Sequence, residues 1–331
     1  MDIAQNDVCC RRICFNALAE LDSSLTFCCD DKATRFNLPT FCPDGLHLVR
    51  LLTRSIYTFA SNLLNLQVSI EDLYAKKLKA ISICLRITYL ILSQSIVNLG
   101  IFTIYNDHCV NNVLEALAAL CIRIQPETEL LIYPKLVNSY FTLMQELAIA
   151  KIDFFIALSP QVFTYVIVTI QVGLNMPDAI VIMRSCSVLF SILMYIFDCD
   201  NKRKRVDNTV QLQNLVQQNM TIFDQIMETA LTIVVYEQNF KLNYISDSFL
   251  LLILLNQKGF NRLYERFVQD MNLDEDSSMA LSLFTEFSTR ATELSPPNSS
   301  SEFLELLMSL RRELSLLMNT PIKEDTSDML V

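Results

Sequence analysis

Apolar side chains recur every three or four residues along most of the chain, and the pattern is clearest from Tyr133 to Leu147. The apolar positions in this stretch are Tyr133, Leu136, Val137, Tyr140, Leu143, Met144 and Leu147. This spacing places them along one face of a helix, where they can be buried together. Pro134 suits the first helical turn, because the N–H that proline lacks has no intrahelical partner there. The stretch predicts an amphipathic helix, and similar stretches precede and follow it.

The same pattern predicts about fourteen helices along the whole chain. They cover residues 8–27, 46–64, 69–97, 107–124, 133–147, 153–158, 161–174, 178–197, 210–218, 220–236, 247–256, 259–271, 276–293 and 301–318. Residues 37–45, with two prolines and a glycine, and the charged residues 198–208 are predicted to be loops. Ser69, Asp107 and Ser159 have the residue types that cap helix N-termini.

Pairs of these helices recur at about forty residues, the spacing of two-helix repeats such as HEAT and armadillo. We therefore predict an all-α fold, a HEAT-like α-solenoid of about seven stacked antiparallel helix pairs. Residues 35–319 would form the solenoid. Residues 1–34 would form an atypical, partly helical N-terminal segment, and residues 320–331 a mobile C-terminal tail.

Composition narrows the classes of function. Apolar residues make up 52% and charged residues 19% of the 331 positions, against about 45–50% and about 25% in typical domains. Only four glycines and no tryptophan occur, which argues against a turn-rich sheet protein and a glycine-rich phosphate loop. The net charge of −10 disfavours nucleic acid as the main partner and favours basic protein surfaces.

Neither metal nor disulfide chemistry is indicated. The eleven cysteines are expected to be reduced, the later ones packing as small core residues in a reducing compartment. A thiolate site could gather Cys9, Cys10, Cys14, Cys28 and Cys29, but the two-residue gaps of zinc knuckles are absent. With His47 and His108 as the only histidines, we predict no metal site and no cofactor. The first residues also lack the basic start and apolar run of a signal peptide.

A multi-spanning membrane protein is the main alternative to a solenoid. Residues 154–177 and 87–106 contain no charge, and both are long enough to cross a bilayer, which takes about 20 apolar residues. However, both contain polar residues at helical spacing, and a third candidate, 179–197, contains Arg184, which is costly inside a membrane. Buried solenoid helices account better for the pattern, so no membrane insertion is expected.

No residue pattern points to catalysis. His108 and Cys109 are neighbours, and side chains adjacent on a helix point about 100° apart, so they form no nucleophile–base pair by themselves. The acidic residues that could serve as acid or base fall at helix ends or in loops, where the helix dipole or water explains them: Glu71, Asp72, Asp274, Glu275, Asp276 and Glu293. We therefore predict that the chain is not an enzyme and has no catalytic residue.

The basic run Lys202-Arg203-Lys204-Arg205 allows two interpretations. It could be a nuclear-localisation signal or a contact for an acidic partner. It could also be a solvated loop between helices. The sequence leaves both open.

Several motifs, in one order along the chain, resemble the C-terminal part of the exportin-7 family, within the importin-β (karyopherin) receptors. They are the residues 71–84, 97–102, 105–107, Tyr133-Pro134-Lys135-Leu136 with Ser139-Tyr140-Phe141, 250–256, Leu310-Arg311-Arg312-Glu313-Leu314 and 328–330. The resemblance covers residues 35 to 331. Most of these motifs consist of packing residues, so Tyr133, Tyr140 and Phe141 are expected to lie between helices and not in a site.

The resemblance implies a superhelix of HEAT repeats and a nuclear export receptor that shuttles between nucleus and cytoplasm. Such receptors bind Ran-GTP and cargo proteins and contact FG-repeat nucleoporins, and exportin-7-like receptors are associated with cargo that carries basic patches. The family's chief Ran-GTP and nucleoporin contacts lie in N-terminal repeats outside the resemblance. No Ran-binding or other partner-binding residue is therefore carried over, and weak or no Ran-GTP binding is expected. A helical scaffold without transport activity is the alternative.

Overall fold

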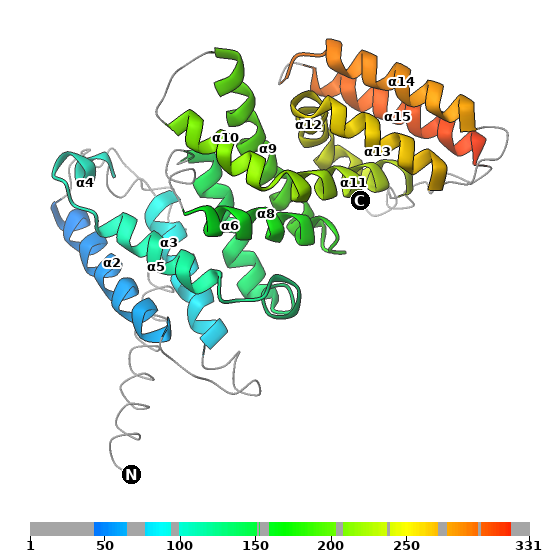
Figure 1. Cartoon of the computed structure of the whole chain (residues 1–331). Helices are drawn as coiled ribbons and strands as arrows, with labels where there is room; N and C mark the ends of the chain where they lie inside the picture. The colour runs from blue at the N-terminus through cyan, green and yellow to red at the C-terminus, as the bar shows by residue number, and fades with distance from the viewer. Residues whose placement is uncertain are drawn as a thin grey trace, which may run out of the picture. The chain divides into compact units, whose positions relative to one another are not determined.

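The computed structural model describes residues 43–64, 77–93, 99–150, 152, 159–202, 208–236, 239–270, 277–296 and 299–318. Within these ranges the secondary structure is helical, with turns between the helices and no strand (Figure 1). The prediction of an all-α fold is confirmed. The chain forms two compact units, Met1–Leu147 and Ala148–Val331.

The first unit is built around three packed helices. α2 (Pro43–Leu64) packs mainly against α5 (Cys109–Cys121), and α3 (Lys79–Ser93) packs against both. The short α4 (Gly100–Ile104) and a π-helical turn, η4 (Pro126–Leu130), lie in the connections.

The helix α6 (Pro134–Ala150), which starts in the first unit, is the amphipathic helix that the sequence shows most clearly. The hydroxyl of Ser82 in α3 donates to the Lys135 carbonyl over 3.0 Å and lies 3.0 Å from the Ser139 hydroxyl. Tyr140 and Phe141 are each 1% exposed, with ring centroids 5.2 Å apart. Both rings therefore pack, as predicted.

The second unit stacks helices in two layers. It contains α8 (Pro160–Leu174), α9 (Ala179–Lys202), α10 (Asn208–Gln218), α11 (Met220–Tyr236), α12 (Asn239–Leu255), α13 (Gln257–Asp270), α14 (Ser277–Glu293) and α15 (Ser300–Leu317). α8 packs on α9 and α11 packs on α12, while α8 also contacts α11 and α9 contacts α12. In a HEAT-like solenoid, neighbouring helix pairs stack so that corresponding helices of the two pairs contact each other. α13, α14 and α15 continue the stack.

Local chemistry sets many of the helix ends. The Ser159 hydroxyl accepts from the Val162 N–H over 3.4 Å at the start of α8, which confirms the predicted cap. Asp178 accepts from the Ile180 N–H over 2.8 Å at the start of α9. The prediction at Ser69, the helices at 8–27 and 153–158 and the tail lie outside the described residues.

Three predicted boundaries are wrong. α2 begins at Pro43, inside the predicted loop, because a proline is tolerated in a first helical turn. α9 continues to Lys202, because polar residues at a helix end can stay helical in water. α12 begins at Asn239 and not near 247, because Leu242, Ile245 and Phe249 continue its buried face.

An aromatic cluster forms the core of α12–α15. Phe260 is fully buried, and its ring centroid lies 5.7 Å from Phe249, 5.5 Å from Tyr264 and 6.1 Å from Phe287. Phe303 of α15 closes the cluster, 5.8 Å from Phe287. Ring pairs at these separations add about 0.5–1.5 kcal/mol each beyond area burial. The cluster therefore ties four helices together.

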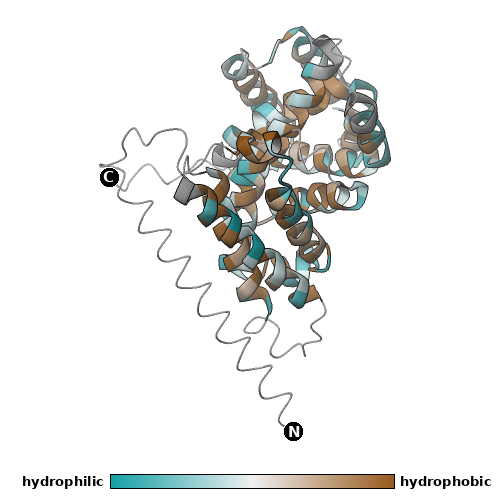
Figure 2. Cartoon of the chain, turned by 90° about the vertical axis from the view of Figure 1, so that its left-hand side faces the viewer, coloured by the Kyte–Doolittle hydropathy of each residue, from teal (hydrophilic) through white to brown (hydrophobic). Residues whose placement is uncertain are grey.

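One described helical segment, Ala179–Asp198, has the length and apolar composition to cross a membrane. Half of it is buried inside the protein, where α9 is covered by α8 and α12. A buried core helix passes the same test of length and composition. Figure 2 shows hydrophobic and hydrophilic residues on different sides of most helices, which is the pattern of one-sided burial.

Candidate functional site

The residues singled out for catalysis have structural roles. His108 is exposed and directly precedes α5, whose first residue is Cys109. The Cys109 N–H donates to Asp107 Oδ1 over 3.1 Å, and the Arg50 Nε donates to Asp107 Oδ2 over 2.8 Å. Burial alone would raise the pKa of Asp107, but these hydrogen bonds and the Arg50 charge hold it below its usual value. Asp107 therefore accepts from the first N–H of α5 and ties the helix to α2, but it does so from one position before the N-cap residue, His108, so the predicted cap is displaced by one residue.

The described cysteines are free thiols and mostly buried. Cys84, Cys121 and Cys186 lie in the core, and burial raises the pKa of each to about 12. Cys109 is half-buried, which also raises its pKa. The expectation that later cysteines pack as small core residues is confirmed at the three buried positions.

The other candidates for acid, base or metal chemistry do not converge. His47 is exposed on α2, and Glu293 is exposed at the end of α14. Within the described part of the chain, no three His, Cys, Asp or Glu side chains are grouped closely enough to hold a metal ion. Glu71, Asp72, Asp274, Glu275, Asp276 and the five N-terminal cysteines lie outside the described residues, as do Arg203, Lys204 and Arg205.

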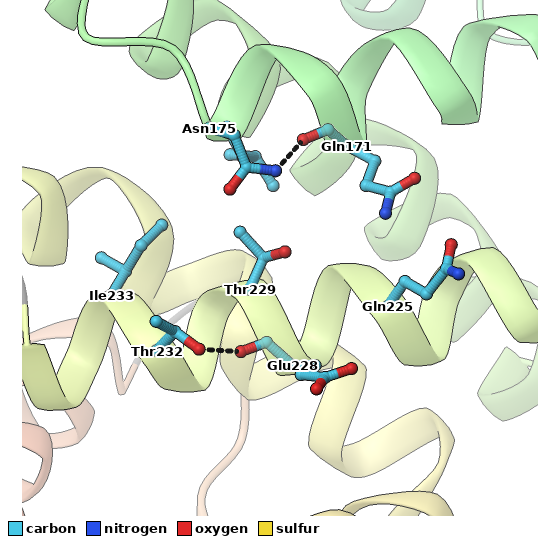
Figure 3. Close-up of a pocket in the computed structure, with 8 residues that line it drawn as sticks. Gln171, Asn175, Gln225, Glu228, Thr229, Thr232 and Ile233 are labelled. Carbon is cyan, nitrogen blue, oxygen red and sulfur yellow. Dashed lines mark hydrogen bonds between the residues drawn. The ribbon is translucent and has the colours of Figure 1, made fainter.

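The second unit contains a polar groove of about 440 Å³ between α8 and α11 (Figure 3). Eight residues line it: Gln171, Leu174 and Asn175 from α8 and its C-terminal end, and Gln225, Glu228, Thr229, Thr232 and Ile233 from α11. The two helices belong to neighbouring pairs of the stack. We refer to these eight residues as the α8–α11 groove.

Some polar atoms of the groove bond within their own helices. Asn175 Nδ2 donates to the Gln171 carbonyl over 3.1 Å, and Thr232 Oγ1 donates to the Glu228 carbonyl over 2.9 Å. The side-chain amides of Gln171 and Gln225 and the carboxylate of Glu228 have no such bond to any residue that the structure describes, and Figure 3 shows the two amides extending from facing helices. These groups are available to a partner.

The groove suits a protein surface better than a small substrate. Amide groups can donate and accept at once, so they match the N–H and C=O groups of a peptide backbone. Glu228 adds a negative charge that a lysine or arginine would complement. The groove is open, and its apolar residues Leu174 and Ile233 are almost fully buried, so it offers no enclosed apolar pocket.

The single residue that connects α12 to α13 also binds α11. Asn256 is the only residue between α12 and α13, and its Oδ1 accepts from the Gly259 N–H over 3.0 Å. Its Nδ2 donates to Asp224 Oδ1 of α11 over 2.9 Å. The same side chain therefore caps α13 and binds α11 one residue before the groove begins at Gln225.

Sequence reasoning did not find the groove, because its two sides come from helices more than forty residues apart. The signal present in the sequence was a polar stripe on α11 at helical spacing, formed by Thr221, Gln225, Glu228 and Thr232. All four are exposed. Such a stripe is also expected of any solvated helix face.

Comparison with curated proteins finds relatives that are named as exportins and Ran-binding proteins. The chain is 31% identical over 258 residues to Exportin-7-B of Xenopus laevis, covering 76% of this chain and 24% of that protein. It is 29% identical to Ran-binding protein 17 of Homo sapiens, with the same two coverages, and 29% identical to Ran-binding protein 16 of Drosophila melanogaster. The chain spans about a quarter of the length of these relatives. No protein-family model and no solved structure matches it.

Proposed function

Because this chain is exportin-7-like over 76% of its length, we propose that it is a partner-binding segment of a nuclear export receptor. The relatives are named for export and for binding Ran, and neither name denotes an enzyme. The collinear similarity is the observation that carries the proposal. The stacked helix pairs support it, because such stacks offer long surfaces to protein partners.

The partner surface in this proposal is the α8–α11 groove, and the partner is a folded cargo protein with a basic patch. The support is chemical: Gln171 and Gln225 offer unbonded amides, and Glu228 offers a carboxylate in a chain of net charge −10. Opposite charges steer a basic partner toward the chain, and local hydrogen bonds then fix its orientation.

A binding measurement with a model basic protein such as lysozyme tests the groove. Glu228→Lys should weaken binding about tenfold, which corresponds to about 1.4 kcal/mol, because a like charge then faces the partner. Glu293→Lys, outside the groove and exposed at the end of α14, makes the same change of net charge. Equal weakening by both variants would mean that only the overall charge matters, and it would reject the groove as the contact.

Binding of Ran-GTP distinguishes an export receptor from the second candidate function, a helical scaffold without transport activity. We expect weak or no binding of Ran-GTP to this chain, measured as retention of Ran loaded with GTP against Ran loaded with GDP. Nanomolar, GTP-dependent binding would contradict that expectation and would support a complete receptor function for the segment.

The same proposal places the chain in both nucleus and cytoplasm, in contact with FG nucleoporins and not inserted in a membrane. Photobleaching the nuclear pool of a fluorescent fusion should be followed by recovery from the cytoplasm. Cell fractionation should leave the protein in the pool released without detergent. A requirement for detergent would instead support the multi-spanning alternative.

A further inference from the structure

The exposed side of α13 carries three cations in one row. Lys258, Arg262 and Arg266 follow one another at four-residue intervals, and all three are exposed. At 1.5 Å per residue, eight residues place the first and last about 12 Å apart along the helix. We call these three residues the α13 basic face.

Helix stability does not explain this arrangement. Cations four residues apart repel each other and destabilise a helix by about 0.2–0.5 kcal/mol for each pair. Lys258 also lies in the first turn, where the helix dipole disfavours a positive charge. The last turn of α13 has no basic residue and ends in Asp270, which is also opposite to the dipole's preference. The repulsion within this row and the charges at the two helix ends therefore oppose the stability of α13, while Glu265 and Asp270, three and four residues after Arg262 and Arg266, act in the opposite sense.

Among the described residues, no acidic side chain pairs with these cations. Arg262 Nε and Arg266 Nε donate to the carbonyls of Lys258 and Arg262, each over 3.3 Å, so the only bonds of these guanidinium groups are to their own helix. Glu265 lies on the same side of α13, and no ion pair forms between it and either arginine. The described residues thus leave three positive charges open to solvent in a chain of net charge −10.

The helix is nevertheless held firmly in place. Phe260, Leu263, Tyr264 and Val268 on its opposite side are buried, and Tyr264 stacks on Phe284 of α14 with centroids 5.5 Å apart. Asn256 fixes its N-terminus through Gly259 and Asp224. A rigid row of charges loses little conformational freedom when a partner binds, which favours affinity.

We propose that the α13 basic face binds an acidic helical segment of a partner protein. Carboxylates at every fourth position of a helix are about 6 Å apart, which matches the spacing of Lys258, Arg262 and Arg266. Two arginines can each hold a carboxylate with two hydrogen bonds. The α8–α11 groove, with its single carboxylate, has the opposite preference, so the two surfaces would hold different partners.

Acidic protein is favoured over nucleic acid by the charge of the whole chain. A polyphosphate must approach a chain in which acidic residues outnumber basic ones by ten, and three cations release few of its counterions. A short acidic helix, in contrast, would place its negative charges only against the three cations of the α13 basic face. The proposal stands apart from the proposed function, because it requires neither Ran nor a basic cargo.

The test measures fluorescence anisotropy of a labelled peptide that carries glutamate at every fourth position, titrated with the whole chain. Binding should weaken at least tenfold in the variant K258Q/R262Q/R266Q. It should change less than twofold in R290Q/R312Q, which removes exposed cations from α14 and α15. Raising the salt concentration from about 50 to about 200 mM should weaken binding to the unaltered chain. Circular dichroism of each variant checks that the fold is retained.

Two further probes give outcomes against the proposal. A peptide of the same composition with its glutamates in one block should bind less tightly, because the spacing no longer matches. Equal binding of both peptides, equal loss in both variants, or tighter binding of a single-stranded oligonucleotide of the same charge would each overturn the assignment. Binding of the spaced peptide with no loss in the α13 variant would place the acidic partner elsewhere.

Discussion

Substitution of Gly259 by alanine should destabilise the second unit, although the same change usually stabilises a helix. Gly259 lies in the first turn of α13. A Cβ added there would fall on the Asn256 side chain, which provides its three nearest atoms. Asn256 would have to move, and its bonds to the Gly259 N–H and to Asp224 would be lost. Helix propensity and local packing therefore predict opposite signs.

The magnitudes decide between them. Replacing glycine in a helix by alanine contributes about 0.5–1 kcal/mol, and near a helix end the smaller value applies. Loss of an asparagine N-cap costs about 1 kcal/mol. Loss of a half-buried hydrogen bond to a carboxylate costs about 1 kcal/mol more. The net effect is a destabilisation of about 1–1.5 kcal/mol, or a fall in Tm of roughly 2–6 °C for a unit of this size.

A double-mutant cycle isolates the cause. Thermal unfolding followed by circular dichroism compares the unaltered chain, Gly259→Ala, Asn256→Ala and the double variant. Once Asn256 is alanine, the obstructing atoms are gone, and Gly259→Ala should raise the Tm of that background. If Gly259→Ala raises the Tm of the unaltered chain, or lowers it equally in both backgrounds, the Asn256 contact is not what decides stability.

Three other measurements test the packing and electrostatics. Phe260→Ala should destabilise the second unit by about 3–5 kcal/mol, because it removes a fully buried ring with three aromatic neighbours. As a control, Met279→Ala at an exposed position should change the stability by less than about 0.5 kcal/mol. Similar losses of stability in the two variants would contradict the described core. Thiol labelling near pH 8 should modify Cys109 before Cys84, Cys121 and Cys186, because burial raises the pKa of each of these three thiols to about 12. Mass spectrometry of the labelled peptides gives the order of labelling, and equal labelling rates would contradict this expectation. Asp107→Asn should lower stability by about 1 kcal/mol at neutral pH by weakening the bond from Arg50. Since the folded pKa of Asp107 is lowered, its contribution is complete above the unfolded value of about 3.9 and is lost as pH falls through the folded value, so unfolding curves of variant and parent should converge in acid.

The helical content was predictable because it depends on local spacing. The stripe from Tyr133 to Leu147 predicted α6, and Ser159 and Pro160 predicted the start of α8, because capping involves residues three apart. The boundary error at α12 arose because the predicted helix started only at Asp247. In the structure α12 had already begun eight residues earlier.

The contacts that organise the second unit were not predictable from local pattern. Phe249, Phe260, Phe287 and Phe303 each look like ordinary core residues, and only the stacking of four helices brings their rings together. Likewise, Asn256 appeared only as a helix end, whereas its bond to Asp224 joins residues 32 positions apart. The three cations of α13 were visible in the sequence, but whether they were paired depended on the neighbouring helices.

The central claim, that the α8–α11 groove contacts a basic protein partner, is tested most directly by site-specific photocrosslinking. A photoreactive residue replaces Gln225 in the groove or, as a control, the exposed Gln161 in the first turn of α8, outside the groove. With lysozyme as the basic probe, we expect cross-linking at Gln225, competition by unlabelled lysozyme, and little product at Gln161. Equal cross-linking at the two positions, or none at Gln225, would contradict the claim.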